Sequence, residues 1–203
     1  MPTQRSYVTT IGSRTIELPL VRLSEDLAIA LLICVDHGVS FTETAGRELA
    51  LALAPFDPEI VVSVATMGIP LAIEVSRALG LDDYVILHKT PKIHLGESYA
   101  EPVVSITTDG RQTLRLDPNR VDAVRGRRVA LVDDVVSTGA STAAALALVR
   151  RAGGIPVVVG TLATEGSGWR TTLNGDAGMV QSLGAIPLFR PDASGSGLRE
   201  VWE

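Results

Sequence analysis

Cysteine and lysine are scarce in this sequence, and each shortage narrows what the chain can do. The 203 residues include one cysteine, Cys34, which lies in the apolar run LAIALLICV. A single thiol cannot form a disulfide within the chain, and an apolar setting favours a buried cysteine over a nucleophile. The 18 basic residues include only two lysines, Lys89 and Lys92, three positions apart. Because solvated lysines could stand anywhere, their proximity indicates a shared role.

Long apolar runs and strong basic charge are also missing. No uninterrupted apolar stretch approaches the roughly 18–20 residues that cross a membrane. The start MPTQRSYVTT lacks the apolar segment of a signal peptide. A formal net charge of −5 argues against a protein that binds nucleic acid mainly through phosphate contacts. We therefore expect a cytoplasmic protein with neither membrane nor nucleic-acid partners.

The material for a folded domain is present. The chain is 46% hydrophobic and 20% charged, and its length suits one domain, residues 1–203. SYVTTIGSRTIELPLV alternates about Gly12-Ser13 and predicts a β-hairpin. Ser24 predicts a capped helix from Glu25 to about Val35, and Thr42 predicts a second helix to about Ala54.

Strand and helix signals alternate between about residues 59 and 164. Buried strands are predicted at EIVVSVA, DYVILH, RRVALVDD and IPVVVGTLA, and helices at LAIEVSRALG and from Gly139 to about Arg151. EPVVSITTDGRQTLRLD predicts a hairpin about Asp109-Gly110. This order predicts a parallel sheet covered by helices, with ligands at the carboxyl ends of the strands. In the tail, LGAIPLFRP is a further ordered segment and DASGSG predicts a flexible linker.

The segment LVDDVVSTGAST, residues 131–142, combines groups that repel and attract anions. The strand ends at Asp133-Asp134, and the next helix begins near Gly139, where free backbone N–H groups and the helix dipole favour a phosphate. Carboxylates accept hydrogen bonds from vicinal hydroxyls. An ordinary capped helix would explain one acid or one hydroxyl but not the whole set. A sugar phosphate satisfies both halves, with hydroxyl donors from Ser137, Thr138, Ser141 and Thr142.

The stretch VALVDDVVSTGAST resembles the phosphoribosyl pyrophosphate (PRPP) signature of type I phosphoribosyltransferases. The resemblance implies an α/β fold with a mostly parallel sheet, a flexible β-hairpin loop, and a small hood formed by residues 1–58 and 165–203. It implies that the acids hold the ribose hydroxyls and, indirectly, the Mg²⁺ that accompanies PRPP. The implied residues for ribose and 5′-phosphate are Asp133, Asp134, Val135, Val136, Ser137, Thr138, Gly139, Ala140 and Ser141.

Two further segments are similar to the family. VSVATMGIP resembles the loop that binds pyrophosphate and often contains a non-proline cis peptide; an ordinary strand-to-helix turn is the alternative. ILHKTPKIHL resembles the RK-x-x-K segment of adenine and xanthine enzymes, and a lysine can hold a mobile polyanion as a point charge. The pyrophosphate-binding residues implied are Ala65, Thr66, Met67, Gly68, Lys89 and Lys92.

The chain departs from the family pattern where the base and the loop are concerned. Met67 stands where adenine enzymes usually have arginine, and Thr108-Asp109 stand where they have a Glu-Tyr pair, so the acidic loop residue is not carried over. Glu97, Tyr99 and Arg111 are weak substitutes for it. Val39 and Phe41 are candidates for binding the base, although a role in starting a helix explains them equally well. LATEGSGW lacks the lysine that xanthine enzymes tend to show there.

The resemblance implies a pentosyltransferase that joins a nitrogenous base to PRPP and releases pyrophosphate, with catalysis carried by Asp133, Asp134 and Lys89. A purine acceptor, as in adenine salvage, and a homodimer are expected on the same grounds. A PRPP-sensing regulator of the purine-repressor type is the alternative. Residues 1–58 lack the basic recognition helix that such a repressor carries.

Overall fold

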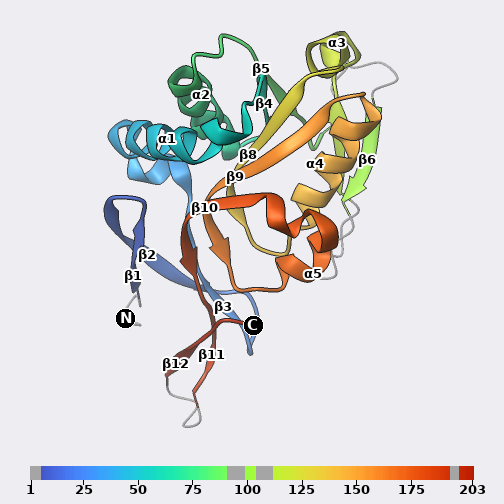
Figure 1. The fold of residues 1–203 in the computed structure, drawn as a ribbon. Helices are drawn as coiled ribbons and strands as arrows, with labels where there is room; N and C mark the ends of the chain where they lie inside the picture. Colours follow the sequence, from blue (N-terminus) through green and yellow to red (C-terminus); the bar gives the residue numbers. More distant parts are fainter. Residues whose placement is uncertain (1–5, 91–98, 104–111, 193–196) are drawn as a thin grey trace.

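The computed structural model describes residues 6–90, 99–103, 112–192 and 197–203. Its centre is a sheet whose five strands are all parallel, in the order β10-β9-β8-β4-β5 (Figure 1). The predicted parallel sheet and its αβ connections are confirmed. The strands are β4 (Ile60–Val64), β5 (Tyr84–Leu87), β8 (Arg128–Val136), β9 (Ile155–Glu165) and β10 (Val180–Ile186).

Helices cover both faces of this sheet, which is why its strands read as continuous apolar runs. Successive side chains of β4 point to opposite faces, so Val62 packs in one cluster with α4, and Val61 packs in the other with α1 and α2. Figure 1 shows α1 and α2 on one side of the sheet and α3, α4 and α5 on the other. The helices are α1 (Val39–Leu53), α2 (Gly68–Leu79), α3 (Val121–Val124), α4 (Ala140–Arg151) and α5 (Trp169–Leu173).

The helix α2 ends where the sequence predicts. Gly80 adopts a left-handed φ of 72°, and its N–H donates to the carbonyls of Arg77 and Ser76. A residue without a side chain adopts this conformation at little cost, and such a glycine closes many helices. The chain then turns into β5, which brings the following residue pair, His88 and Lys89, to the carboxyl edge of the sheet.

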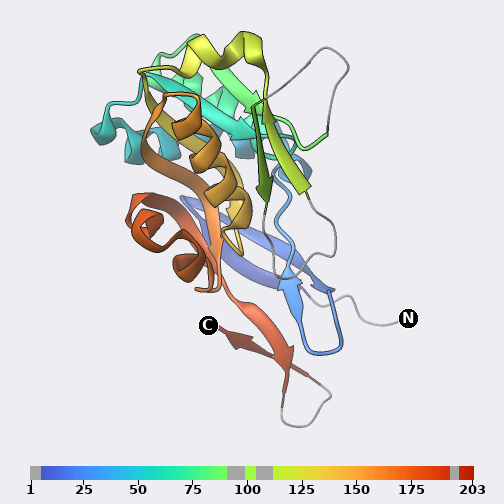
Figure 2. The ribbon, with the colours of Figure 1, turned by 90° about the vertical axis from the view of Figure 1, so that its right-hand side faces the viewer.

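A two-stranded antiparallel ribbon extends the sheet beyond β5. Strands β6 (Tyr99–Val103) and β7 (Gln112–Leu116) pair, and a single bridge joins His88 to Arg115. The ribbon lies along α4 (Figure 2), where Leu114 and Leu116 are fully buried. Both arms of the predicted hairpin are therefore confirmed, whereas its turn, at Asp109-Gly110, lies outside the described residues.

A second sheet, which we call the hood, is built from both terminal segments. Its order is β1-β2-β3-β11-β12, with every pair antiparallel. β10 ends at Ile186 and β11 begins at Leu188, so the hood starts where the carboxyl edge of the core sheet ends. The strands are β1 (Ser6–Ile11), β2 (Arg14–Arg22), β3 (Ala28–Ala30), β11 (Leu188–Pro191) and β12 (Leu198–Val201).

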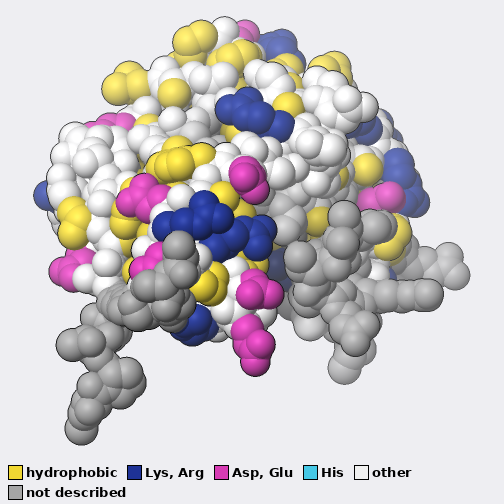
Figure 3. All heavy atoms as spheres, turned by 90° about the horizontal axis from the view of Figure 1, so that it is seen from below, with side chains coloured by type: hydrophobic (Ala, Val, Ile, Leu, Met, Phe, Trp, Pro, Cys, Tyr) yellow, Lys and Arg dark blue, Asp and Glu magenta, His cyan; other side chains and the backbone are white. Residues whose placement is uncertain are grey.

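The hood is tied to the core at the predicted β1–β2 turn. The Gly12 N–H donates to the Leu183 carbonyl of β10 at 3.0 Å, and the Ser13 N–H donates to Glu48 of α1 at 3.0 Å. The hood also has a charged surface. Arg190 and Arg199 lie directly opposite each other on β11 and β12, and Figure 3, a view of this end, shows basic side chains gathered among acidic ones.

One predicted helix is wrong. Residues 25–35 form no α-helix; instead β3 pairs with β2 and β11, and a short 3₁₀ helix follows at Cys34–His37. Pairing on both sides satisfies the backbone of β3, and Ala28 and Ala30 are buried, so tertiary contacts override the local helix signal. Ser24 takes part in a tight turn, in which its hydroxyl accepts from the Asp26 N–H at 3.3 Å.

Other boundaries shift. α1 begins at Val39, directly after Gly38, and the Thr42 hydroxyl donates to the Gly38 carbonyl at 3.0 Å inside the helix rather than capping it. α1 packs on the core although it falls within the 1–58 segment, and β10 extends the core sheet past residue 164.

Of DASGSG, residues 193–196 lie outside the described part. Cys34 is fully buried, as predicted. Among the described helices, none is long and apolar enough to cross a membrane.

Candidate functional site

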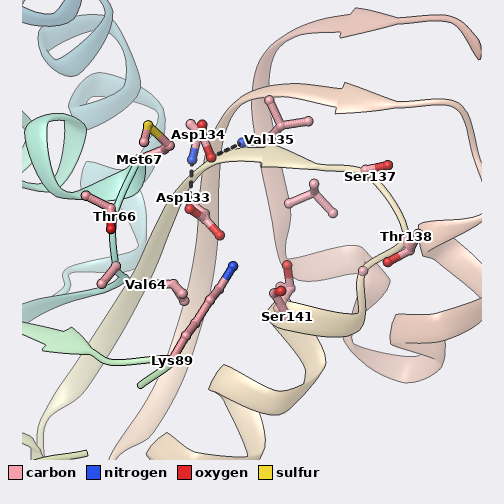
Figure 4. Close-up of a pocket in the computed structure, with 14 residues that line it drawn as sticks. Val64, Thr66, Met67, Lys89, Asp133, Asp134, Val135, Ser137, Thr138 and Ser141 are labelled. Atoms are coloured by element: carbon pink, nitrogen blue, oxygen red, sulfur yellow. Dashed lines mark hydrogen bonds between the residues drawn. The ribbon is translucent and has the colours of Figure 1, made fainter. Parts of the chain in front are cut away.

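A pocket of about 200 Å³ opens at the carboxyl edge of the core sheet (Figure 4). Three segments that are far apart in the sequence converge there: the loop after β4, the residue pair after β5, and the end of β8 with the start of α4. Parallel strands bring their carboxyl ends to one edge, so the topology itself assembles this site. It is lined by Val64, Ala65, Thr66, Met67, Lys89, Asp133, Asp134, Val135, Val136, Ser137, Thr138, Gly139, Ser141 and Thr142.

Most residues that the resemblance implicates are therefore brought together. Gly68 and Ala140 are buried next to lining residues without lining the pocket themselves. Lys92 lies outside the described residues, as do Glu97 and Arg111. Tyr99 is described only as part of β6.

The acidic pair is held by its own backbone. One oxygen of Asp133 accepts from the Asp134 N–H at 3.0 Å, and one oxygen of Asp134 accepts from the Val135 N–H at 3.0 Å. Thr161 of the neighbouring strand β9 donates to the Asp134 carbonyl at 2.9 Å. Both carboxyls are thus fixed in direction, and in Figure 4 the second oxygen of Asp133 points toward the pocket.

Crowding of the two acids changes their protonation. Burial, followed by repulsion from Asp134, raises the pKa of Asp133 to about 8. Burial also raises the pKa of Asp134. The ammonium group of Lys89 acts in the opposite direction and lowers the pKa of both. Without a ligand, the Asp133 carboxyl therefore keeps its proton at neutral pH. A cation or a set of hydroxyl donors close to the carboxyl favours release of that proton.

The start of α4 forms the other half of the pocket. Gly139 precedes the helix with a left-handed φ of 78°, and a side chain there would come within 3.2 Å of the Trp169 carbonyl of α5. Thr138 accepts from the Ala140 N–H at 3.3 Å. The first turn of a helix presents backbone N–H groups and the positive end of the dipole. This geometry suits a phosphate, as the sequence predicts.

Sequence reasoning missed Glu165. This carboxylate ends β9, is 6% exposed, and accepts a hydrogen bond from Ser137. Burial raises its pKa, and the bond from Ser137 opposes that shift. The signal was available, because a carboxylate that closes the buried run IPVVVGTLATE needs a partner. Glu165 thus holds the Ser137 side chain in the turn before α4.

The loop after β4 has the backbone that the resemblance implies. The peptide between Ala65 and Thr66 is cis and does not involve proline. The Ala65 N–H donates to the Leu87 carbonyl of β5 at 2.8 Å, and the Ile69 N–H donates to the Thr66 carbonyl at 3.2 Å. Thr66 and Met67 are exposed to the pocket, opposite the start of α4 (Figure 4).

The two candidates for binding a base lie elsewhere. Phe41 is 5% exposed, packs within the core cluster of α1, and contacts the ring of His37 with centroids 5.0 Å apart. Val39 is 83% exposed at the start of α1. Neither lines the pocket, so a role of these residues in base binding stays a prediction.

The acids suit magnesium that arrives with a phosphate ligand. Among the described residues, no group of three or more His, Cys, Asp or Glu side chains could hold a metal ion. Mg²⁺ commonly binds through one or two carboxylates, with phosphate oxygens and waters completing six ligands. Asp133 and Asp134 match that limited share of the ligands.

The fold and the pocket define an α/β protein whose site suits a phosphorylated sugar. The family model described as the phosphoribosyl transferase domain matches residues 45–183, and the chain belongs to this family. The resemblance to type I phosphoribosyltransferases and the fold it implies are therefore confirmed.

The names of the relatives point to different substrates. The chain is 33% identical over 171 residues to an orotate phosphoribosyltransferase of Erythrobacter litoralis, covering 73% of this chain and 76% of that enzyme. It is 34% identical over 115 residues to an adenine phosphoribosyltransferase of Gluconacetobacter diazotrophicus, covering 55% and 60%. It is 31% identical over 118 residues to an amidophosphoribosyltransferase of Synechococcus elongatus, covering 58% of this chain but only 23% of that protein.

Solved structures agree on the architecture. An adenine phosphoribosyltransferase from Thermoanaerobacter pseudethanolicus superposes with a TM-score of 0.58 at 22% identity, covering 74% of this chain and 83% of that one. The Giardia lamblia enzyme that was solved with 9-deazaadenine gives a TM-score of 0.60 at 16% identity, covering 89% and 93%. At such identities the likeness establishes the fold alone.

Proposed function

We propose that this protein transfers the 5-phosphoribosyl group of PRPP to the ring nitrogen of a purine base, in an adenine-like salvage reaction, and releases pyrophosphate. The observation that carries the proposal is the convergence of the acidic pair, the start of α4 and Lys89 on one pocket. PRPP has a diol, a 5′-phosphate and a pyrophosphate, and each finds a suitable group there.

Each segment of the pocket has one part of PRPP to hold. The carboxylates of Asp133 and Asp134 accept hydrogen bonds from the ribose hydroxyls. The turn from Ser137 to Ser141 surrounds the 5′-phosphate with amides and hydroxyls. The cis-peptide loop at Ala65–Thr66 and the ammonium group of Lys89 face the pyrophosphate, with Gly68 allowing the loop to pack closely against β8.

Positioning and charge supply the rate in this proposal. The bond from the anomeric carbon to the pyrophosphate oxygen breaks, the bond to the base nitrogen forms, and the proton of that nitrogen passes to solvent. Lys89 stabilises charge on the departing pyrophosphate, while Asp133 and Asp134 hold a ribose on which positive charge develops. Mg²⁺, when bound with PRPP, would add neutralisation of the phosphate oxygens.

The similarities of this chain point to more than one acceptor base. The segment around Lys89 resembles adenine and xanthine enzymes, whereas the named relatives include orotate and adenine enzymes. A panel of purine and pyrimidine bases, each with PRPP and Mg²⁺, tests the choice by nucleotide formation. Adenine as the best acceptor supports the proposal, and turnover of orotate alone contradicts the purine assignment.

The same assay decides between enzyme and regulator. A regulator binds PRPP without turning over any base, whereas the proposed enzyme releases pyrophosphate only when a base is present. A homodimer is part of the proposal, on the family resemblance, and sedimentation of the purified protein tests it.

A further inference from the structure

A buried hydroxyl lies behind the acidic pair. Ser63 is on β4, is fully buried, and its Oγ has no hydrogen-bond partner among the described residues. Burying a hydroxyl without a partner is unfavourable, so a structure that retains one normally offers it a partner in some state.

The position of Ser63 suggests which partner. A β-carbon built on Gly68, the first residue of α2, would lie 2.4 Å from Ser63 Oγ and 2.8 Å from Asp133 Oδ1. The hydroxyl and the carboxylate oxygen therefore converge on one point, which is free only because residue 68 has no side chain. A serine hydroxyl reaches several directions by rotating between staggered positions.

Asp133 has one side toward the pocket and one side toward Ser63. Its Oδ1 accepts from the Asp134 N–H at 3.0 Å, and the other oxygen points toward the tip of Lys89 (Figure 4). Val64 and Asp133 line the pocket, whereas Ser63 and Gly68 are buried and do not line it. A donor at Ser63 would thus hold the inner oxygen of Asp133 without contacting a ligand.

We propose that Ser63 is a positioning residue, whose hydroxyl donates to Asp133 Oδ1 when that carboxylate holds the ribose hydroxyls. This inference rests on the proposed function, because it requires Asp133 to bind the sugar. The hydroxyl and the Asp134 N–H together fix the inner oxygen, so the outer oxygen keeps its direction. Gly68 provides the space in which the two groups meet.

The test compares two buried hydroxyls. Ser76 of α2 is also buried and its Oγ also lacks a partner among the described residues, about 12 Å along the helix from Gly68. Ser63→Ala and Ser76→Ala remove the same group, and calorimetry with ribose 5-phosphate and with pyrophosphate, each with Mg²⁺, measures the effect.

A hydrogen bond to a charged group supports a loss of roughly tenfold. We expect Ser63→Ala to bind ribose 5-phosphate about tenfold more weakly and to bind pyrophosphate within twofold of wild type. Ser76→Ala should match wild type for both ligands. Ser63→Cys, which fills the space of the hydroxyl with a slightly larger group and a weaker donor, should behave like Ser63→Ala.

Three results would overturn the inference. Unchanged ribose 5-phosphate affinity in Ser63→Ala removes the proposed donor. Equal losses for both ligands indicate a disturbed loop, because Ser63 precedes the cis-peptide segment. If Ser63→Cys binds ribose 5-phosphate as tightly as wild type, the loss in Ser63→Ala comes from packing rather than from a missing hydrogen bond. If the wild-type protein binds neither ligand, the proposed function fails first, which distinguishes that outcome from a failure of the positioning role.

Discussion

Lys89 extends from the end of β5 toward Asp133 on β8, although β4 lies between these two strands (Figure 4). The ammonium group lowers the pKa of the carboxyl that it faces, against the larger effect of burial. A cation and an acid that share one pocket can act on the two ends of a ligand, pyrophosphate and ribose diol. The predictions below separate these two roles.

The acidic pair should be required for binding but not for folding. Asp133→Asn with Asp134→Asn keeps the shape of both side chains and removes the charge that accepts from the ribose hydroxyls. We expect PRPP binding to fall below detection in calorimetry while the circular dichroism spectrum is unchanged. Wild-type affinity in this double variant would show that the sugar lies elsewhere.

Asp133 should also lower stability at neutral pH. Its folded pKa of about 8 lies above the ordinary value of 3.8, so the folded state binds the proton more tightly than the unfolded state. Stability is then greatest below about pH 4 and falls as the pH rises toward 8. The single variant Asp133→Asn has no ionisable group at this position, so it should not lose stability in this way as the pH rises.

Urea unfolding at a series of pH values checks that expectation. Each unit by which the folded pKa is raised corresponds to about 1.4 kcal/mol, so Asp133→Asn should be more stable than wild type by several kcal/mol at pH 8, and the difference should disappear near pH 4. A constant difference across this range would mean that packing, rather than ionisation, sets the effect.

Lys89 should discriminate between ligands. Lys89→Ala removes the charge that faces the pyrophosphate, so PRPP should lose at least tenfold in affinity while ribose 5-phosphate loses little. Arg127→Ala is the matched control for net charge, because this exposed arginine precedes β8 at the end opposite the pocket. Equal losses for both ligands in Lys89→Ala would place the lysine away from the pyrophosphate.

Gly139 should be needed for binding the 5′-phosphate as well as for the backbone conformation of the turn. Gly139→Ala forces a β-carbon into a φ of 78° and to 3.2 Å from the Trp169 carbonyl. Gly126→Ala imposes similar backbone strain at φ 73° with nothing within 4 Å. Both should lose about 1–2 kcal/mol of stability. Only Gly139→Ala should weaken the binding of ribose 5-phosphate, as measured by calorimetry. An equal loss of affinity in Gly126→Ala would show that backbone strain anywhere in the chain, rather than the phosphate site, causes the effect.

The sequence predicts the core of the fold well because its signals are local and agree with one another. β4 is wholly apolar apart from Ser63, α2 closes at Gly80, and β8 runs into the acidic pair, so periodicity, capping and motif indicate the same elements. The pocket follows from them, since parallel strands place residues 65–67, 89 and 133–142 at one edge.

The parts that sequence reasoning missed depend on contacts between distant segments. β3 is a strand because β2 and β11 pair with it, and no local signal in residues 28–30 reports those partners. Glu165 meets Ser137, and Ser63 meets Gly68 and Asp133, only through packing of neighbouring elements. The hood that would select a base is built from such contacts, which is why the acceptor is harder to predict than the donor.

Base-dependent release of pyrophosphate from PRPP tests the central claim most directly. The purified protein is mixed with PRPP and Mg²⁺, with and without adenine, and both pyrophosphate and nucleotide are measured. The proposed function predicts that the two products appear in equal amounts and only when the base is present, and that Asp133→Asn with Asp134→Asn abolishes both. PRPP binding without product from any purine or pyrimidine base would contradict it.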